Sequence, residues 1–570
     1  MANRPPLVAP PKEAEDVRPP EEAGGEARAS WLPLLVVVLT QIQVSFTVNA
    51  LTVSMAGVTS DLGIAPTSIG TAITTGTFAM AAFILLGAKI GSKFGSRLVF
   101  QLAVVIHGLA MGVVALAVNG GMLLAGQAIG GAVIALLAPT LTVFIADNYR
   151  GSQQAQAIGY LAAAIPAAGV LALLIAGTLA STIGWRYSFG LLVALAALNL
   201  FLSFRVRPVP AQRHLGIDWV GALLSSTAII LLSVGFSGLT AWGPLIAKAN
   251  APFNVVGLSP APFLILLGIV LGQVFFSWTR RRQAANQPQL FSLDVIDTAE
   301  ERATTFCMAT MLFVGTAANF LIPLYMQMVQ GLSSLQTSFS IIPYTLSIFI
   351  ANTLVARLYD RVPPRTIARI GFVVVAAALA LIGFTIRNEW GQLFIVLGLI
   401  TLGLAQGAIV ALVFNTLLSA SPKELAGDDG AWRGLVHNIS GSVGIAVAGA
   451  VAVGLLSTLI VNNIVNNPLI PPELKAQINL DNVNFITNEQ LEDVLAQTTA
   501  TPEQVDEAVR VNAEMRLRSL RASLLLLSGL ALLAVIPAGK MPGYVPGDIP
   551  VGYPAEDGGG RIRDDAAPAS

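Results

Sequence analysis

Long runs of apolar residues recur along almost the whole chain and are separated by short polar turns. Each run approaches the roughly twenty residues that an α-helix needs to cross a bilayer core of about 30 Å. Backbone polar groups must pair within each segment in lipid, which favours helices. The pattern predicts about fourteen spans, at residues 31–56, 68–90, 98–118, 121–146, 155–181, 187–204, 217–239, 262–279, 303–328, 337–357, 366–386, 392–418, 433–459 and 520–538.

The composition agrees with a chain that is surrounded by lipid. Hydrophobic residues make up 54% of the sequence and charged residues 11%, against about 25% charged residues in soluble domains. The formal net charge is zero, so we expect no nucleic-acid partner. Cys307 is the single cysteine, which excludes an intrachain disulfide and a cysteine-based zinc site. We find no phosphate-binding loop, metal-ligand cluster or nucleophile–base pair, and therefore expect no cofactor, no metal and no enzyme activity.

Basic residues are distributed unevenly over the short loops. The opposite loops hold little beyond Arg186, Lys248 and Arg387, whereas one set of loops carries Lys89, Lys93, Arg97, Arg150, Arg205, Arg207, Arg213, Arg280, Arg281, Arg282, Arg357, Arg361, Arg365 and Arg369. Because basic loops stay in the cytoplasm, we expect a multi-pass protein of a bacterial-type inner (plasma) membrane with both termini inside. Residues 1–30 and 541–570 are predicted to be disordered cytoplasmic tails.

One segment on the predicted outer side is long and polar. Residues 461–519 contain Thr487-Asn-Glu-Gln490 and Thr501-Pro-Glu-Gln504, which both fit a helix capping box. We expect two short polar helices, the second leading into the last span. A solvated loop that closes the final hairpin is the ordinary interpretation; a substrate lid or a docking element for an outside adaptor protein is the alternative.

Two stretches of the chain resemble each other. Residues 126–137 and 403–414 both begin with small residues and Gln and continue as an aliphatic run. Two six-helix halves repeated in parallel are a known transporter plan. We therefore expect an all-α membrane fold with bundles at 31–204 and 303–540, two additional spans within 205–302, and the outside loop 461–519 in the second bundle.

Several motifs resemble the major facilitator superfamily, in particular its fourteen-span drug:proton antiporter branch. The most specific are Phe320-Leu-Ile-Pro-Leu-Tyr-Met-Gln-Met-Val-Gln-Gly331, Ile342-Pro343, Arg357-Leu-Tyr-Asp-Arg361 and Asp218-Trp-Val-Gly221. The resemblance covers roughly residues 31 to 540. It implies two six-helix halves, two extra central helices and a transport function.

The motifs that carry function in that family are altered here. The turn after the second span holds Lys89, Ser92, Lys93, Gly95 and Arg97, with Ser92 where the family has an Asp that latches one conformation. In the fifth span, Pro166 and Gly169 resemble the antiporter Gly-Pro motif with its first glycine lost; close helix packing is their ordinary role and hinging is the alternative.

The usual carboxylates are missing as well. The first, fourth and fifth predicted spans contain no Asp or Glu. An ionisable group inside the membrane costs about 2.5–3.5 kcal/mol, so its presence generally marks ion handling. The usual proton carriers of the branch are therefore absent.

Neutral amides are the remaining polar groups inside the spans. Any one of them is ordinarily explained by a hydrogen bond between helices. Together they suit a substrate cavity, because the family fold turns several of these helices toward its centre. The preferred lining residues are Gln43, Asn49, Gln127, Asn319 and Gln406.

Arg433 and His437 are one helical turn apart and share a face. An imidazole can change its charge near neutral pH, so this pair is the candidate for proton coupling. The ordinary alternative is that Arg433 reaches the cytoplasmic surface and His437 is packed.

The sequence thus predicts a secondary active transporter in the lipid bilayer that exports amphipathic or lipophilic small molecules by alternating access, with proton coupling as an option. Two alternatives remain open at this point. One is an uncoupled lipid or metabolite carrier, and the other is a non-transporting receptor or membrane partner of an outside adaptor.

Overall fold

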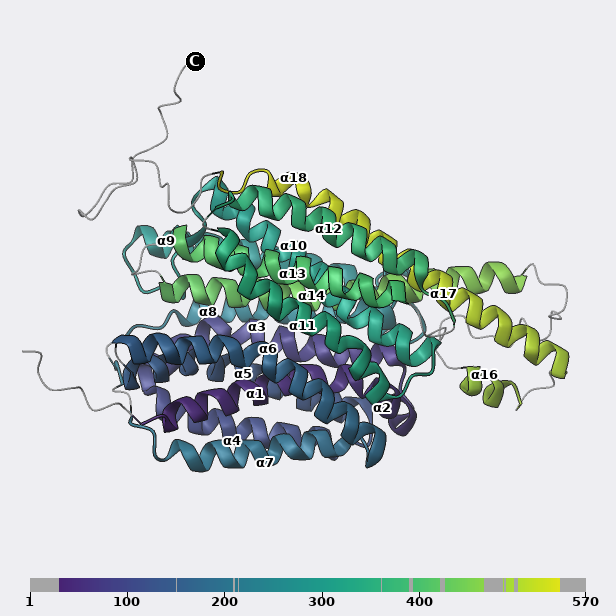
Figure 1. Ribbon diagram of the computed structural model, residues 1–570, viewed down its shortest axis with the longest axis horizontal. Coiled ribbons are helices and arrows are strands. Elements are labelled where there is room, and N and C mark those ends of the chain that lie inside the picture. Colours follow the sequence, from purple (N-terminus) through teal and green to yellow (C-terminus); the bar gives the residue numbers. More distant parts are fainter. Residues whose placement is uncertain are drawn as a thin grey trace, which may run out of the picture.

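The computed structural model describes residues 30–149, 151–208, 211–213, 215–359, 361–388, 393–420, 426–465, 485, 488–496 and 501–543. Nearly all of these residues are helical, and the long helices run side by side along one common direction (Figure 1). The predicted all-α membrane fold is confirmed.

The first half of the chain forms six long helices and one short helix. They are α1 (Leu32–Val53), α2 (Met55–Leu62), α3 (Pro66–Phe94), α4 (Ser96–Ala115), α5 (Gly120–Asn148), α6 (Gly151–Thr182) and α7 (Arg186–Ser203). Local signals set their ends: the Asn119 side chain accepts a hydrogen bond from the Met122 amide at the start of α5. Gly95 has φ 95° where α3 turns into α4, a conformation that favours glycine.

Two further helices, α8 (Trp219–Ala241) and α9 (Pro260–Ala284), form a hairpin between the halves of the sequence. Asp218 caps α8 by accepting from the Gly221 amide at 2.9 Å. The same carboxylate accepts from Trp278 Nε1 of α9 at 3.1 Å and lies 3.7 Å from Arg282. The motif Asp218–Gly221 thus fastens the end of α9 to the start of α8.

The second half begins with a short 3-10 turn, η1 (Leu293–Ile296). Its helices are α10 (Ala299–Leu324), the π-helical η2 (Tyr325–Val329), α11 (Ser334–Tyr359), α12 (Pro364–Thr385), α13 (Leu393–Ala420), α14 (Ala426–Val465), α16 (Asn488–Leu495), α17 (Pro502–Leu533) and α18 (Val535–Ala538). Thr298 and Glu301 form a capping box at the start of α10.

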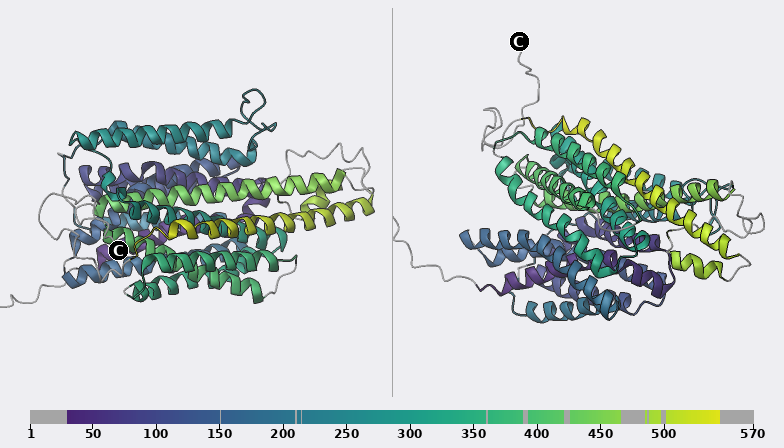
Figure 2. Two further views of the ribbon diagram at one scale, coloured as in Figure 1. Left: turned by 90° about the horizontal axis from the view of Figure 1, so that it is seen from above. Right: turned by 45° about the vertical axis from the view of Figure 1, so that its right-hand side comes forward.

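We call the end of the bundle with the start of α1 and α18 the terminal end, and the opposite end, with α2 and α16, the distal end (Figure 1). The two halves lie one above the other in that view. The turned view shows that the two halves diverge toward the terminal end (Figure 2, right).

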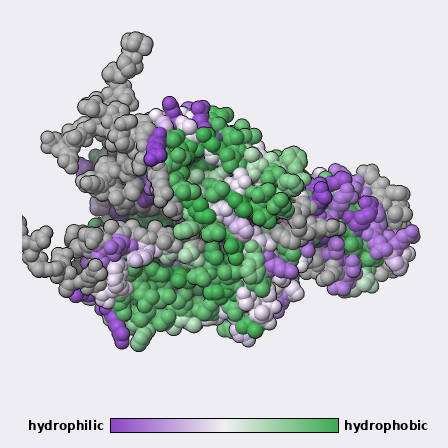
Figure 3. All heavy atoms as spheres, viewed as in Figure 1, coloured by the Kyte–Doolittle hydropathy of each residue, from purple (hydrophilic) through white to green (hydrophobic). Residues whose placement is uncertain are grey.

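Thirteen helices of the described part are long and apolar enough to cross a membrane, and the apolar part of α6, Ala167–Thr182, is a shorter one. Apolar side chains cover the long sides of the bundle, whereas hydrophilic residues gather at its ends (Figure 3). Large residues such as Leu223 and Phe384 are 69% and 72% exposed on these sides. This surface suits lipid, and the prediction of about fourteen spans is confirmed.

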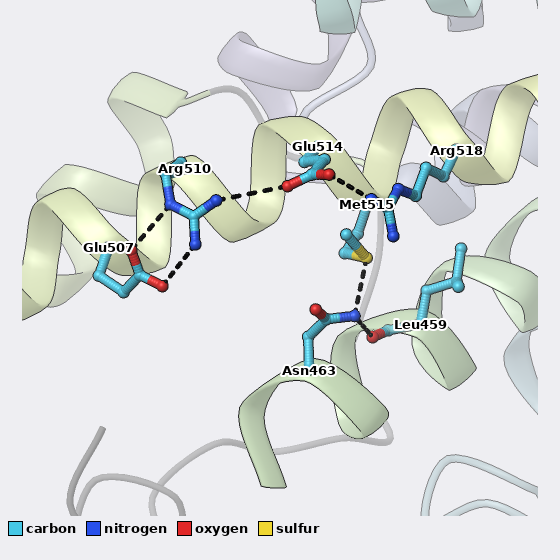
Figure 4. A network of polar contacts seen from close by, with 7 residues as sticks. All are labelled: Leu459, Asn463, Glu507, Arg510, Glu514, Met515 and Arg518. Carbon is cyan, nitrogen blue, oxygen red and sulfur yellow. Dashed lines mark hydrogen bonds and ion pairs between the residues drawn. The ribbon is translucent and has the colours of Figure 1, made fainter. Parts of the chain in front are cut away.

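At the distal end, α14 and α17 extend beyond the apolar belt (Figures 1 and 3). α17 starts at the predicted capping box of Thr501 and Gln504, which is confirmed, whereas Thr487 lies outside the described residues. The first turns of α17 carry a ladder of ion pairs in which Arg510 lies 2.7 Å from Glu507 and 3.4 Å from Glu514 (Figure 4). The second predicted polar helix is therefore continuous with the last span.

Candidate functional site

The halves meet along two seams. The first seam joins α3 to α14. At the terminal end Lys89 Nζ lies 3.7 Å from Asp428 Oδ1, and further along the helices Thr77 Oγ1 lies 2.6 Å from Ser442 Oγ. A β-carbon at Gly434 would lie 2.6 Å from Ile84, so glycine permits this close approach. The first seam therefore holds the two halves together from the terminal end to the middle of the bundle.

The second seam joins α6 to α11. Ser338 Oγ donates to the Leu173 carbonyl at 2.8 Å, and the Leu335 amide donates to Ser181 Oγ at 3.0 Å. Gly169 faces α11, since a β-carbon there would lie 3.8 Å from Thr345. α6 runs unbroken through Pro166. These contacts lie toward the distal end of the two helices, where the second seam is closed.

A glutamine closes the distal end between the seams. Gln327 of η2 donates from Nε2 to the Thr52 carbonyl of α1 at 3.1 Å and accepts at Oε1 from the Ala56 amide of α2 at 2.9 Å. Gln327 is 2% exposed. The sequence analysis placed it in the Phe320–Gly331 motif but not among the preferred site residues, because its partners are backbone atoms that carry no sequence signal.

The predicted turn is divided between the halves. Arg97 donates to the Phe204 carbonyl at 2.8 Å within the first half, and the Gln212 amide, in the connection from α7 to α8, donates to the Ser92 carbonyl at 2.9 Å. Lys93 is half-buried in the same turn. Lys89 reaches Asp428 in the second half. The carboxylate at this seam thus comes from α14, while Ser92 occupies the position where the resembling family has its Asp.

Two predicted amides of the second half lie on neighbouring helices. Gln406 of α13 accepts at Oε1 from the Tyr344 hydroxyl at 2.6 Å. A β-carbon at Gly315 of α10 would lie 2.5 Å from Gln406 Nε2. Asn319 follows Gly315 by one helical turn, so it lies on the same face of α10, and it is half-buried.

The predicted amides of the first half have different surroundings. Gln127 is 4% exposed, and its Nε2 has no hydrogen-bond partner among the described residues. A β-carbon at Gly76 of α3 would lie 3.3 Å from its Oε1. Asn49 is half-buried and donates to the Ser45 carbonyl at 2.8 Å. Gln127 is thus the predicted amide with unused hydrogen-bonding capacity.

Gln43 lies in the interior of the first half. Its Nε2 lies 2.7 Å from His107 Nδ1, and its Oε1 accepts from Asn199 at 2.8 Å. Thr47 Oγ1 contacts the other ring nitrogen of His107 at 3.3 Å. The network joins α1, α4 and α7, so Gln43 packs within one half rather than between the halves.

Arg433 and His437 lie on α14 near the first seam. Arg433 Nε is 3.0 Å from Asp429 Oδ2, a fully buried carboxylate, and the guanidinium carbon lies 5.3 Å from the centre of the Phe414 ring. His437 is exposed, although α14 packs against α3, α8 and α10. Arg433 is therefore paired inside the second half instead of extending to the surface.

The arrangement is that of a polytopic membrane transporter: two six-helix halves are joined along two seams, with polar groups between them. A model of the Major Facilitator Superfamily matches residues 37–445. The chain belongs to this superfamily. It is a transporter of small molecules and not an enzyme, as the sequence predicted.

Relatives and solved structures agree with this assignment. The chain is 25% identical over 466 residues to the puromycin resistance protein pur8 of Streptomyces alboniger. The aligned region covers 80% of this chain and 87% of the relative. It is 26% identical over 436 residues to the cephamycin export protein CmcT of Amycolatopsis lactamdurans, covering 75% and 81%. The fold resembles an inward-facing, occupied bacterial homologue of the human lysosomal transporter Spinster, with a TM-score of 0.57, 17% identity and coverage of 90% and 97%.

Proposed function

We propose that the chain exports amphipathic or lipophilic small molecules across the plasma membrane by alternating access between its two halves. Relatives are named for resistance to puromycin and for resistance to and export of tetracenomycin C. The observation that carries the proposal is the distal closure by Gln327, which bridges α10–η2 to α1 and α2 through two hydrogen bonds. A contact of this kind must break when the distal end opens.

The proposed state is closed at the distal end and open toward the terminal end along the second seam, while the first seam keeps its terminal contact between Lys89 and Asp428. The second seam is bonded at Leu335 and Ser338 near the distal end, and the halves diverge toward the terminal end (Figure 2). His437 of α14 is exposed, which fits an opening beside this helix. Alternating access then requires the Gln327 contacts to open while the terminal end closes.

The proposed cargo site lies between Gln127 and Asn49 in the first half and Asn319 and Gln406 in the second. The unpartnered Nε2 of Gln127 supports it, because a buried donor without a partner costs about 1–3 kcal/mol and gains from a bound acceptor. Largely apolar walls with few polar groups suit amphipathic cargo.

We further infer that the terminal end is cytoplasmic and that His437 takes part in proton coupling. The orientation rests on the basic residues of that end, such as Lys89 and Arg281. On a Cys307→Ser background, single cysteines at Ser92 and Ala284 should react with an impermeant maleimide only from the cytoplasm. A cysteine at Asp506 should react only from outside, and the reverse pattern would refute this orientation.

Accumulation in cells tests the export function. The parent chain, expressed in a bacterium that lacks its own multidrug exporters, should lower the steady-state uptake of radiolabelled puromycin or ethidium. The Gln127→Leu variant, at equal membrane abundance, should lower it less. Equal accumulation in cells with the parent and with an empty vector for a panel of amphipathic compounds would contradict the proposal.

A further inference from the structure

A cavity lies between the central hairpin and the second half, away from the faces where the two halves meet. It has a volume of about 420 Å3 and is lined by residues of α8, α9, η1, α10 and α14. Its walls are almost wholly apolar and include Leu232, Phe276, Ala309 and Val436. Cavities that bind small molecules measure about 300–1,000 Å3, so this one can hold a ligand.

The packing of α9 explains why the cavity exists. α8 packs against both α3 and α14, whereas α9 packs chiefly against α8. The two hairpin helices touch closely at Gly268, where a β-carbon would lie 2.9 Å from the Ala228 carbonyl oxygen. One turn further along, a β-carbon at Gly272 would meet nothing within 4 Å. The space therefore opens beside Gly272, between α9 and α10.

The cavity faces the bilayer. Its inner walls are α8 and α14, which contact each other and both contact α3, so they separate it from the seams between the halves. At its rim Ile269 of α9 and Phe306 of α10 are 50% and 57% exposed. A ligand would therefore enter from the surrounding lipid.

Aromatic side chains line the cavity toward the terminal end. The Trp432 ring stacks on Phe291 with centroids 5.4 Å apart and meets Phe276 edge-on at 6.1 Å. Trp432 Nε1 donates to Thr305 Oγ1 at 3.4 Å. This cluster fixes the inner wall, which leaves the rim between α9 and α10 as the accessible side.

Positive charge lies at the terminal end of the rim. Arg302 is the one charged residue among those that line the cavity, and its Nη1 donates to the Asp297 carbonyl at 2.5 Å. Arg280 follows Phe276 by one helical turn and is exposed. Of the acidic residues in this segment, Asp294 accepts from Gln283 at 2.9 Å and Glu301 accepts from the Thr298 amide at 2.9 Å, while Asp297 and Glu300 also lie close to Arg302 in the sequence.

We propose that this cavity binds an acyl chain of an anionic phospholipid from the leaflet at the terminal end, with the headgroup phosphate at Arg302 and Arg280. Basic pockets between membrane helices recognise anionic headgroups, and the apolar cavity is filled by the chain through van der Waals contact. The lipid would brace the α8–α9 hairpin against α10 and α14. The proposal does not depend on which compounds the protein exports.

Native mass spectrometry of the purified full chain tests it. After titration with equimolar dioleoylphosphatidylglycerol and dioleoylphosphatidylcholine, the parent should retain one phosphatidylglycerol with at least a tenfold preference. Gly272→Leu should fill the cavity and reduce this retention at least tenfold. Gly529→Leu is the matched control, because a β-carbon at Gly529 of α17 also meets nothing within 4 Å, and it should retain the lipid as the parent does.

A charge variant keeps the test decisive if Gly272→Leu fails to fold. Arg302→Gln leaves the apolar walls intact and should remove the preference for phosphatidylglycerol. Arg281→Gln should preserve it, since Arg281 lies on the opposite face of α9 from Gly272. No anionic preference in the parent, or an unchanged preference in Arg302→Gln, would overturn the proposal. Displacement of the lipid by an exported dye, with dye flux lost in Gly272→Leu, would make the cavity a cargo site and would also overturn it.

Discussion

Gln327 and Thr52 join the two halves at the distal end, with the side-chain amide of one donating to the backbone carbonyl of the other at 3.1 Å. The Ala56 amide completes the contact at 2.9 Å. Because η2 is π-helical where α10 would otherwise continue, and single π-turns often occur at functional sites, the distal closure depends on a local irregularity of the second half.

Replacing Gln327 with Leu should shift the protein toward distal-open states. Two hydrogen bonds are lost, each contributing about 0.5–1.5 kcal/mol, which changes the ratio of states roughly 5- to 150-fold. Cysteines at Ser181 and Leu335 on the Cys307→Ser background report this change, because they span the second seam. Their oxidative cross-linking should slow in Gln327→Leu.

Gln330 supplies the control for this experiment. It belongs to the same segment, but its Nε2 donates to the Tyr325 hydroxyl at 2.7 Å and to the Arg387 carbonyl at 3.3 Å, all within the second half. Gln330→Leu should leave cross-linking at the parent rate. Equal rates in the parent and both variants would show that Gln327 does not hold the distal end closed.

Gln127 and Gln43 should separate transport from stability. Gln127→Leu removes a donor that has no described partner, so the thermal midpoint should hold while flux falls. Gln43→Leu leaves His107 and Asn199 without their partner, at about 1–3 kcal/mol for each unpaired group, and should lower the midpoint. Tryptophan fluorescence during heating measures the midpoint, and dye efflux measures transport. If Gln127→Leu lowered the thermal midpoint and Gln43→Leu lowered the dye efflux instead, Gln127 would be removed from the proposed cargo site.

Exchanging the charges of Lys89 and Asp428 tests the terminal contact of the first seam. Both side chains are partly exposed, so the ion pair stabilises the contact by about 0.2–1 kcal/mol. Lys89→Asp should therefore slow transport by up to roughly fivefold. Adding Asp428→Lys should restore the parent rate. Lys93→Asp in the same turn is the control, because Lys93 makes no ion pair within the described part of the chain. A double variant as slow as Lys89→Asp would show that the pair has no role.

His437→Gln should abolish the stimulation of transport by a pH gradient while preserving exchange without a gradient. The neighbouring Arg433 is paired with Asp429 at 3.0 Å, which leaves His437 as the titratable group proposed for coupling on this face of α14. His214→Gln, at a position between α7 and α8 in the sequence, is the control histidine. Unchanged gradient stimulation in His437→Gln would exclude His437 as the coupling residue.

The spans were predictable because the bilayer sets the length of an apolar run. α3, predicted at 68–90, extends over Pro66–Phe94. The last span, predicted at 520–538, consists of the end of α17 and of α18, and α17 already begins at Pro502 after the capping residue Thr501. These features are local in sequence. The capping box at Thr501 needs only a residue three positions away.

The role of each amide was not predictable, because it depends on partners that are distant in sequence. Gln43 bonds residues 64 and 156 positions away. Gln327 bonds the backbone of α1 and α2 more than 270 positions away. The pattern of polar residues inside spans indicates that such groups must be paired or functional, and only the packing of helices separates the two outcomes.

Transport in proteoliposomes tests the central claim most directly. The Ser181→Cys and Leu335→Cys variant, on the Cys307→Ser background, should catalyse flux of a fluorescent amphipathic dye when reduced. It should lose that flux when the disulfide locks the second seam closed, and regain it after addition of dithiothreitol. Flux that is equal in the oxidised and reduced protein, or no higher than in protein-free liposomes, would contradict export by alternating access.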